Sequence, residues 1–141
     1  MRNYITDASV ILKWVLDEDR DADRHKALDL LKTWAEGRAR IFAPSLWRYE
    51  VGNFLGRECP TEADQKMALL LDLHLEEISF NTQFCHRCFT WMKEKKITFY
   101  DAVYLSSAIE IQGVLITANE RFVKKMGKMD HLCLLNHFQV Q

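Results

Sequence analysis

Three acidic residues lie far apart along the chain, each in otherwise apolar surroundings. Asp7 follows a short apolar run, Glu50 lies inside an amphipathic helical pattern, and Asp101 begins a stretch that is apolar or small at nearly every position. An ionised carboxylate in such surroundings is costly unless an opposite charge compensates it, and no Lys or Arg stands obviously beside any of the three. One divalent cation shared by all three would compensate them together.

Each acid also has a structural explanation. Asp7 is well placed to cap a helix over residues 8–16, but we favour a site role because it stands at the carboxyl end of a strand, where α/β sheets bind ligands. Glu50 shares a helical stripe with Leu46 and Phe54, and the alternative is that it lies at the edge of the stripe and reaches water. Asp101 follows Thr98 by three positions, which is the pattern of a capping box.

The elements that must position these acids alternate along the chain. Short apolar runs predict strands, and longer patterns between them predict helices, so we expect an α/β fold with a parallel sheet covered by helices on both faces. Gly37, Gly113 and Gly127 stand where helix C-caps belong. The predicted strands are 3–6, 40–43, 77–80, 114–117 and 132–135, and the predicted helices are 8–16, 21–36, 45–57, 61–75, 82–93, 99–112 and 120–126.

Composition limits the class of protein. The chain has 141 residues, 48% of them hydrophobic, and no Pro/Gly-rich linker, so we expect one domain over residues 1–141. No membrane-spanning run or signal peptide is recognisable, and we expect a cytoplasmic protein with no membrane partner. The net charge of −1 means that any nucleic-acid binding must come from a local basic surface or a metal ion.

The four cysteines are expected to be free thiols. A zinc site at Cys85 and Cys88 is rejected because no second pair follows at a suitable spacing. These two cysteines share a helical stripe with Phe84, Phe89 and Met92, so we expect the stripe to be buried.

Four motifs together resemble a PIN domain, most closely the VapC-type toxin ribonucleases. They are YITDAS at residues 4–9, Glu50, YDAVYL at 100–105 and LITANERF at 115–122, in the right order along essentially the whole chain. The resemblance implies a three-layer α/β/α fold with a central parallel sheet of about five strands. It also implies that Asp7, Glu50 and Asp101 bind Mg²⁺ or Mn²⁺, the hard cations that prefer oxygen ligands.

What the resemblance implies about function follows from that metal site. Such enzymes are endoribonucleases that hydrolyse single-stranded RNA. The metal activates the attacking water and neutralises charge on the phosphate. The toxins of the family are typically homodimers inhibited by a VapB-like antitoxin, and Trp14 and Trp34 are candidates to line the groove that this partner occupies.

Asn119 departs from the family pattern, which usually has an Asp in this turn. Asn retains a carbonyl oxygen but lacks the negative charge, so a second metal ion would bind less tightly. We include Asn119 among the catalytic candidates, although it is also well placed to cap the helix that follows. The substitution leaves open an alternative, a PIN-like domain that binds RNA or a partner without cleaving.

Substrate contacts are assigned to hydroxyl and basic groups near the same place. Ser9 and Thr117 would hold a phosphate oxygen or a metal-bound water, and Lys95, Lys96 and Arg121 belong to two basic clusters near the proposed pocket. Lys13 and Arg48 are secondary candidates. A third hypothesis is a phosphoryl-transfer signalling domain that is phosphorylated at Asp7. It fits less well, because Ser9 stands where a second Asp would be expected.

Overall fold

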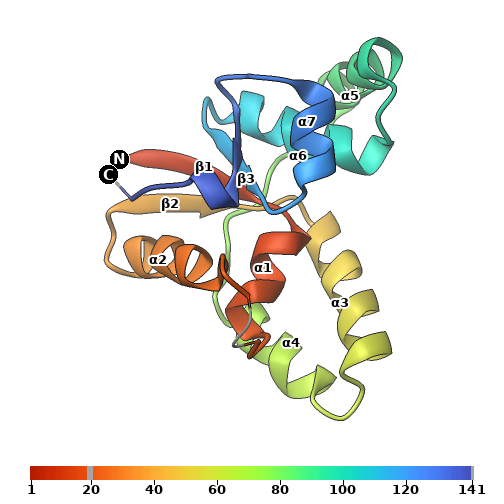
Figure 1. Ribbon diagram of the computed structural model, residues 1–141. Helices are drawn as coiled ribbons and strands as arrows, with labels where there is room; N and C mark the ends of the chain where they lie inside the picture. The colour runs from red at the N-terminus through yellow and green to blue at the C-terminus, as the bar shows by residue number, and fades with distance from the viewer. Residues whose placement is uncertain (19–20, 141) are drawn as a thin grey trace.

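A parallel four-stranded sheet forms the centre of the computed structural model, which describes residues 1–18 and 21–140. The strands are β1 (Arg2–Thr6), β2 (Ala39–Phe42), β3 (Val114–Thr117) and β4 (Leu132–Leu134), in the spatial order β2-β1-β3-β4 (Figure 1). All three pairings are parallel. The α/β fold with a parallel sheet, expected from the alternation of elements, is confirmed.

The fifth predicted strand, 77–80, is wrong. The chain touches the sheet edge only at Glu76, which forms a single parallel bridge to Phe42 and accepts a 2.9 Å hydrogen bond from the Ala43 amide. Beyond that point Ile78 packs against the core while Phe80 is 67% exposed. The alternation of side chains therefore reflects a segment lying along the surface, and not a strand paired in the sheet.

Seven α-helices of the described residues form two groups, one on each face of the sheet (Figure 1). The first group is α1 (Ala8–Val15), α2 (Arg24–Ala35), α3 (Leu46–Glu58) and α4 (Ala63–Leu71), and the second is α5 (Thr82–Lys95), α6 (Phe99–Glu110) and α7 (Glu120–Met126). A short 3₁₀ helix, η1 (Leu135–His137), follows β4. All seven predicted helices are present, and the largest difference is at 61–75, where α4 ends already at Leu71. None of these helices, within residues 1–18 and 21–140, is long and apolar enough to cross a membrane.

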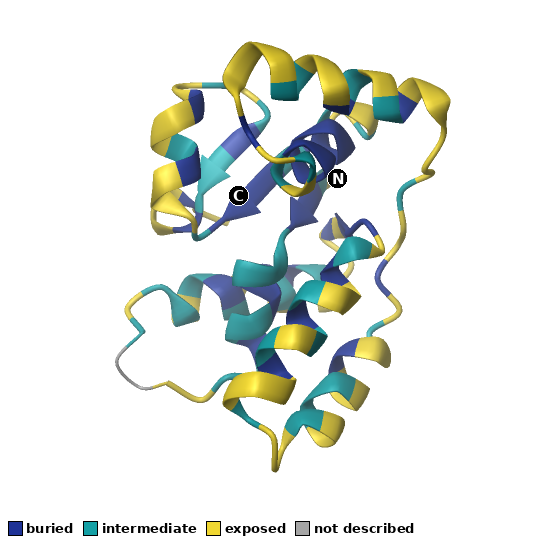
Figure 2. Ribbon diagram, turned by 90° about the vertical axis from the view of Figure 1, so that its right-hand side faces the viewer, coloured by how far each residue is buried: buried dark blue, intermediate teal, exposed yellow. Residues whose placement is uncertain are grey.

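Two hydrophobic clusters lie on opposite faces of the sheet because successive side chains of a strand point in opposite directions. Tyr4 and Ile116 belong to the cluster under α1–α4, whereas Ile5 and Leu115 belong to the cluster under α5–α7. Figure 2 shows the result: the strands are largely buried, while the outer helices carry exposed residues on one side. Helix α6 is buried at every position from 102 to 108, as its apolar sequence predicts.

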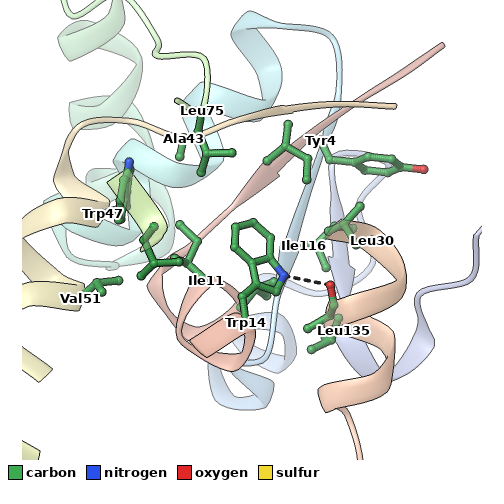
Figure 3. Packing of buried hydrophobic residues seen from close by; sticks show 14 of the residues in the cluster. Tyr4, Ile11, Trp14, Leu30, Ala43, Trp47, Val51, Leu75, Ile116 and Leu135 are labelled. Carbon is green, nitrogen blue, oxygen red and sulfur yellow. Dashed lines mark hydrogen bonds between the residues drawn. The ribbon is translucent and has the colours of Figure 1, made fainter. Parts of the chain in front are cut away.

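Trp14 is a core residue and not part of a docking groove. Its side chain is 7% exposed and lies among Ile11, Leu30 and Ile116, and its indole N–H donates to the Ala27 carbonyl at 2.9 Å (Figure 3). The expectation that Trp14 lines a partner groove is therefore wrong. Trp34 is only partly buried against the same core.

Gly113 has a packing role and not the predicted C-cap role. Helix α6 ends at Glu110 with Ile111 as its C-cap, and Gln112 adopts the left-handed conformation with φ of 52°. A Cβ on Gly113 would lie 2.4 Å from the Asn3 carbonyl oxygen. Glycine is needed because the chain passes directly against β1 at this point.

The four cysteines, all within the described residues, are free thiols as expected. Cys88 and Phe84 are buried on the inner side of α5, but Phe89 is 58% exposed, so the predicted apolar stripe is only partly buried.

Candidate active site

Asp7 lies at the carboxyl end of β1, as its sequence position predicts. It is the N-cap of α1 and accepts a 3.3 Å hydrogen bond from the Val10 amide. The hydroxyls of Ser9 and Thr117 donate to its two carboxylate oxygens, each at 2.5 Å. Thr117 reaches Asp7 because β1 and β3 are parallel neighbours, with Thr6 opposite Ile116.

The environment of Asp7 acts on its protonation in two directions. Burial raises the pKa of the Asp7 carboxyl, and the hydrogen bonds from Ser9, Thr117 and the Val10 amide offset part of that increase. A group whose charge is disfavoured by burial, and which has only neutral donors around it, gains from a nearby cation.

Glu50 faces α6 from the third helix. Its Oε1 accepts a hydrogen bond of 2.5 Å from the Tyr104 hydroxyl, and the side chain is half-buried. Burial is the main cause that raises the pKa of Glu50, and the negative charges of Asp7 and Asp101 raise it further. Asp7 at the end of β1 and Asp101 in α6 are therefore each close enough to Glu50 in α3 to disfavour its negative charge.

Asp101 lies in the first turn of α6, where Thr98 is the N-cap. The Thr98 hydroxyl accepts from the Asp101 amide at 3.1 Å, so the predicted capping interaction is confirmed. Burial raises the pKa of the Asp101 carboxyl, while the Thr98 hydroxyl and the charge of Lys125 lower it. The expectation that no basic residue stands beside the acids is wrong for Asp101, because the fold brings Lys125 near it from α7.

Asn119 caps α7, as predicted. Its side-chain Oδ1 accepts a hydrogen bond from the Phe122 backbone N–H at 3.1 Å, and its backbone N–H donates to the Thr117 hydroxyl at the same distance. Thr117 thus connects Asp7 to the turn that carries Asn119.

A shallow cavity of about 320 Å³, here called the basic hollow, opens beside Asp101 and Asn119. Lys96, Arg121 and Lys125 line it, and Lys125 donates a 2.6 Å hydrogen bond to the Lys96 carbonyl. Two of the predicted substrate contacts, Lys96 and Arg121, therefore line the same cavity as Asp101. Lys95 is exposed in the last turn of α5 and does not line the hollow.

The donor set at the acids suits a hard divalent cation, since carboxylate and hydroxyl oxygens surround the site. Within the described residues, no three His, Cys, Asp or Glu side chains are close enough to hold one ion as they stand. Glu50 is engaged by Tyr104, and Asp7 by Ser9 and Thr117. A cation would have to draw the three carboxylates together, and its positive charge would offset the repulsion that opposes their approach.

The model of the PIN domain family matches residues 4–128. The chain belongs to the PIN domain family. No curated protein matches the sequence.

Solved structures with the same fold include toxins. The chain resembles a protein from Pyrobaculum aerophilum at 20% identity and a TM-score of 0.65, over 96% of this chain and 92% of that one. It resembles a toxin–antitoxin complex from Klebsiella pneumoniae at 18% identity and a TM-score of 0.66, over 94% of this chain and 97% of that one. It also resembles the sarcin-ricin loop cleaving toxin VapC20 of Mycobacterium tuberculosis at 14% identity and a TM-score of 0.60, over 82% of this chain and 87% of that one. At these identities the likeness establishes the fold.

Sequence reasoning missed Tyr104 as a site residue of this PIN domain. Burial and the neighbouring Glu50 carboxylate raise the pKa of the Tyr104 phenol, so it stays a neutral hydrogen-bond donor. The available signal was its spacing: Tyr104 follows Asp101 by three positions and therefore shares a helix face with it.

The secondary basic candidates lie in ion pairs instead. Lys13 pairs with Asp21, and Arg48 pairs with Glu77 at 2.5 Å. Neither lines the basic hollow.

Proposed function

We propose that this PIN domain is a Mg²⁺- or Mn²⁺-dependent endoribonuclease that hydrolyses single-stranded RNA. The observation that carries the proposal is the effect of two acids on the third: both Asp7 and Asp101 raise the pKa of Glu50. Three carboxylates held near one another, without a cation between them, cost stability, and binding a divalent ion would recover it.

The residues have distinct roles in this proposal. Asp7, Glu50 and Asp101 would hold the ion, which would supply an activated water and neutralise charge on the phosphate. Ser9 and Thr117 orient the oxygens of Asp7, and Tyr104 orients Glu50. Lys96 and Arg121 would attract the phosphate backbone, and Asn119 fixes the start of α7 beside them.

The test is cleavage of single-stranded RNA by the purified chain with and without Mn²⁺. We expect cleavage that needs the ion and that is abolished by Asp7→Asn or Asp101→Asn. Asp72→Asn, an exposed acid at the end of α4, is the matched control and should cleave normally. Thermal unfolding shows whether each variant is folded. RNA cleavage that survives in both folded amide variants contradicts the proposal.

A second candidate is a PIN domain that binds RNA or a partner but does not cleave. Asn119 favours it, because the side chain carries no charge and its Oδ1 is engaged in capping α7. A Mn²⁺ titration separates the two functions, since ion binding without turnover of any RNA supports the second. For a nuclease, Asn119→Asp should preserve or increase Mn²⁺-dependent cleavage, because it adds a charged oxygen ligand.

We further propose that the chain is the toxin of a type II toxin–antitoxin pair and acts as a homodimer. The proposal is supported by the fold it shares with the Klebsiella pneumoniae toxin–antitoxin complex. Expression of the chain alone should stop bacterial growth, and co-expression with the neighbouring VapB-like reading frame should restore it. Growth arrest that also occurs with Asp101→Asn would show that toxicity does not depend on cleavage.

A further inference from the structure

A second cavity, here called the aromatic groove, lies on the other side of the α6 N-terminus from the basic hollow. It encloses about 190 Å³ and is lined mainly by apolar groups, among them Leu46, Tyr49, Phe80, Phe99 and Tyr100. Small-molecule sites usually measure about 300–1,000 Å³. The groove is therefore suited to one small flat group, and not to a folded element of another protein.

The aromatic side chains around the groove are unusually exposed. Tyr49 is 75% exposed, Phe80 67% and Tyr100 58%. Large apolar groups that gather on a surface commonly mark a binding site. The proposed catalytic roles described above use none of these three rings.

Packing between rings holds the Phe80 side of the groove in place. The Phe80 ring lies 6.4 Å from that of Phe99 at 80°, and 5.8 Å from that of Phe84 at 51°. Phe84 is buried in the core. Because Phe80 is anchored in this way, its exposed face is presented to the solvent as a fixed surface.

Each tyrosine of the groove directly precedes one of the acids. Tyr49 stands before Glu50 in α3, and Tyr100 stands before Asp101 in α6. Neighbouring positions on a helix point about 100° apart. The acids can therefore face the proposed metal site while the tyrosines line the groove beside it.

The first turn of α6 separates two surfaces of different chemistry. Thr98 and Asp101 line the basic hollow, whereas Phe99 and Tyr100 line the aromatic groove. A single-stranded nucleic acid has the matching arrangement, since its phosphates are anionic and its bases are flat apolar surfaces that stack on aromatic rings. A strand that crosses this turn would bring its backbone to the acids.

We propose that the aromatic groove binds an unpaired nucleobase of the RNA strand while an adjacent phosphate lies at the basic hollow. This proposal rests on the proposed ribonuclease function and specifies how its substrate is held. It would restrict the substrate to single-stranded RNA, because a base that is paired and stacked in a duplex cannot enter the groove.

The test is binding of a short fluorescent RNA to the full chain in EDTA, measured by fluorescence anisotropy so that cleavage does not interfere. We expect Tyr49→Ala and Tyr100→Ala each to weaken binding by about fivefold or more, since stacking contributes about 1–3 kcal/mol per base. Tyr49→Phe and Tyr100→Phe keep the ring and should bind within about twofold of the unchanged protein. Leu69→Ala is the control, because Leu69 is a similarly exposed apolar residue on α4.

An RNA with abasic sites provides the decisive comparison, because it keeps the phosphates and lacks the bases. It should bind the unchanged protein more weakly than the intact RNA, and Tyr49→Ala should weaken it no further. Equal binding of intact and abasic RNA, or no RNA binding at all, overturns the proposal. So does normal RNA binding by the alanine variants together with a change from dimer to monomer in light scattering, which would assign the groove to a second copy of the chain.

Failure of the groove and failure of the nuclease are distinguishable. If the unchanged protein cleaves RNA with Mn²⁺ but is indifferent to abasic sites, only the groove proposal fails. If the alanine variants lose binding but no RNA is cleaved under any condition, the groove stands and the nuclease proposal fails.

Discussion

The carboxylates of the site reduce the stability of the fold that holds them. For an acid whose pKa is raised by folding, the folded state binds the proton more tightly than the unfolded state does. Stability therefore increases as the pH falls through the folded-state pKa, and the ionised group is destabilising at neutral pH. Asp7, Glu50 and Asp101 all have a raised pKa, with burial as the largest cause.

Glu50→Gln should therefore stabilise the protein at neutral pH while abolishing Mn²⁺-dependent cleavage. The amide retains an oxygen for the Tyr104 hydroxyl and removes the repulsion from the two aspartates. Because Glu50 is half exposed, we expect a gain of no more than about 1 kcal/mol, or a few degrees in unfolding temperature. The gain should shrink as the pH falls toward the usual value of 4.5, where Glu50 itself becomes protonated.

Circular dichroism melting curves in EDTA at a series of pH values check this prediction, with Glu94→Gln, an exposed acid of α5, as control. Mn²⁺ should raise the unfolding temperature of the unchanged protein more than that of Glu50→Gln. A variant that melts lower than the unchanged protein at neutral pH would show that the charge of Glu50 is stabilising.

Residue roles that depend on local spacing were predictable from the sequence, and those that depend on remote contacts were not. The caps Asp7, Thr98 and Asn119 were predicted because each donor amide lies within three positions. The partner of Glu50 was missed because Tyr104 is 54 positions away. Spacing identified the acids as candidates, but it could not show which side chains hold them.

At the scale of elements, three helix N-termini meet at the candidate site, and Glu50 joins them from within α3. Asp7, Thr98 and Asn119 are the N-caps of α1, α6 and α7, and the side chain of each accepts a hydrogen bond from an amide in the first turn of its helix. The amides of a helix N-terminus carry partial positive charge, which favours the anionic groups of the acids and of a phosphate. The fold thus places the N-termini of α1, α6 and α7 near the carboxyl end of the sheet.

Thr98→Ala should affect both the stability of α6 and the protonation of Asp101. Loss of the cap should cost about 1 kcal/mol of unfolding free energy. The Thr98 hydroxyl also lowers the pKa of Asp101, so its removal raises that pKa and should move the acidic limb of the cleavage profile to higher pH. Thr98→Ser keeps the hydroxyl and should restore both properties. An unchanged pH profile in Thr98→Ala would mean that Asp101 does not limit activity.

A separate prediction concerns Gly113, which lies just after α6 and packs against Asn3 of β1. Gly113→Ala should destabilise the fold by about 2 kcal/mol or more, because the new Cβ meets the backbone oxygen of Asn3, which cannot easily move. Gly56→Ala is the matched control: Gly56 lies in α3 with nothing within 4 Å, and alanine should stabilise that helix by about 0.5–1 kcal/mol. Chemical denaturation measures both. Equal effects at the two positions would contradict the close contact.

The missing fifth strand shows the limit of period-two patterns at the same scale. Residues 77–80 alternate in the way that a strand does, but only Glu76 pairs with the sheet. Nothing in the pattern distinguishes a strand from an extended surface segment, because pairing depends on whether the edge of β2 continues beyond Phe42. It does not, since the chain turns into α3 within four residues.

At the scale of the whole molecule, the distribution of charge matters more than its sum. The net charge is −1, yet Lys96, Arg121 and Lys125 gather at one cavity beside Asp101. Any nucleic-acid binding by a protein of this net charge would depend on such a local surface and would weaken as salt is added. The net charge alone does not indicate a nucleic-acid-binding protein. The fold nevertheless provides the local basic surface that such binding would require.

Arg121→Ala should reduce both the affinity for single-stranded RNA and its dependence on salt. Removing one phosphate contact lowers the slope of log affinity against log salt by about one. Arg38→Ala is the matched control, because Arg38 is an exposed arginine just before β2, at the end of the sheet opposite the acids. Anisotropy titrations in EDTA at several salt concentrations measure both slopes. If Arg121→Ala and Arg38→Ala lower the slope equally, the RNA is held by diffuse charge over the whole surface, and the basic hollow is not its binding site.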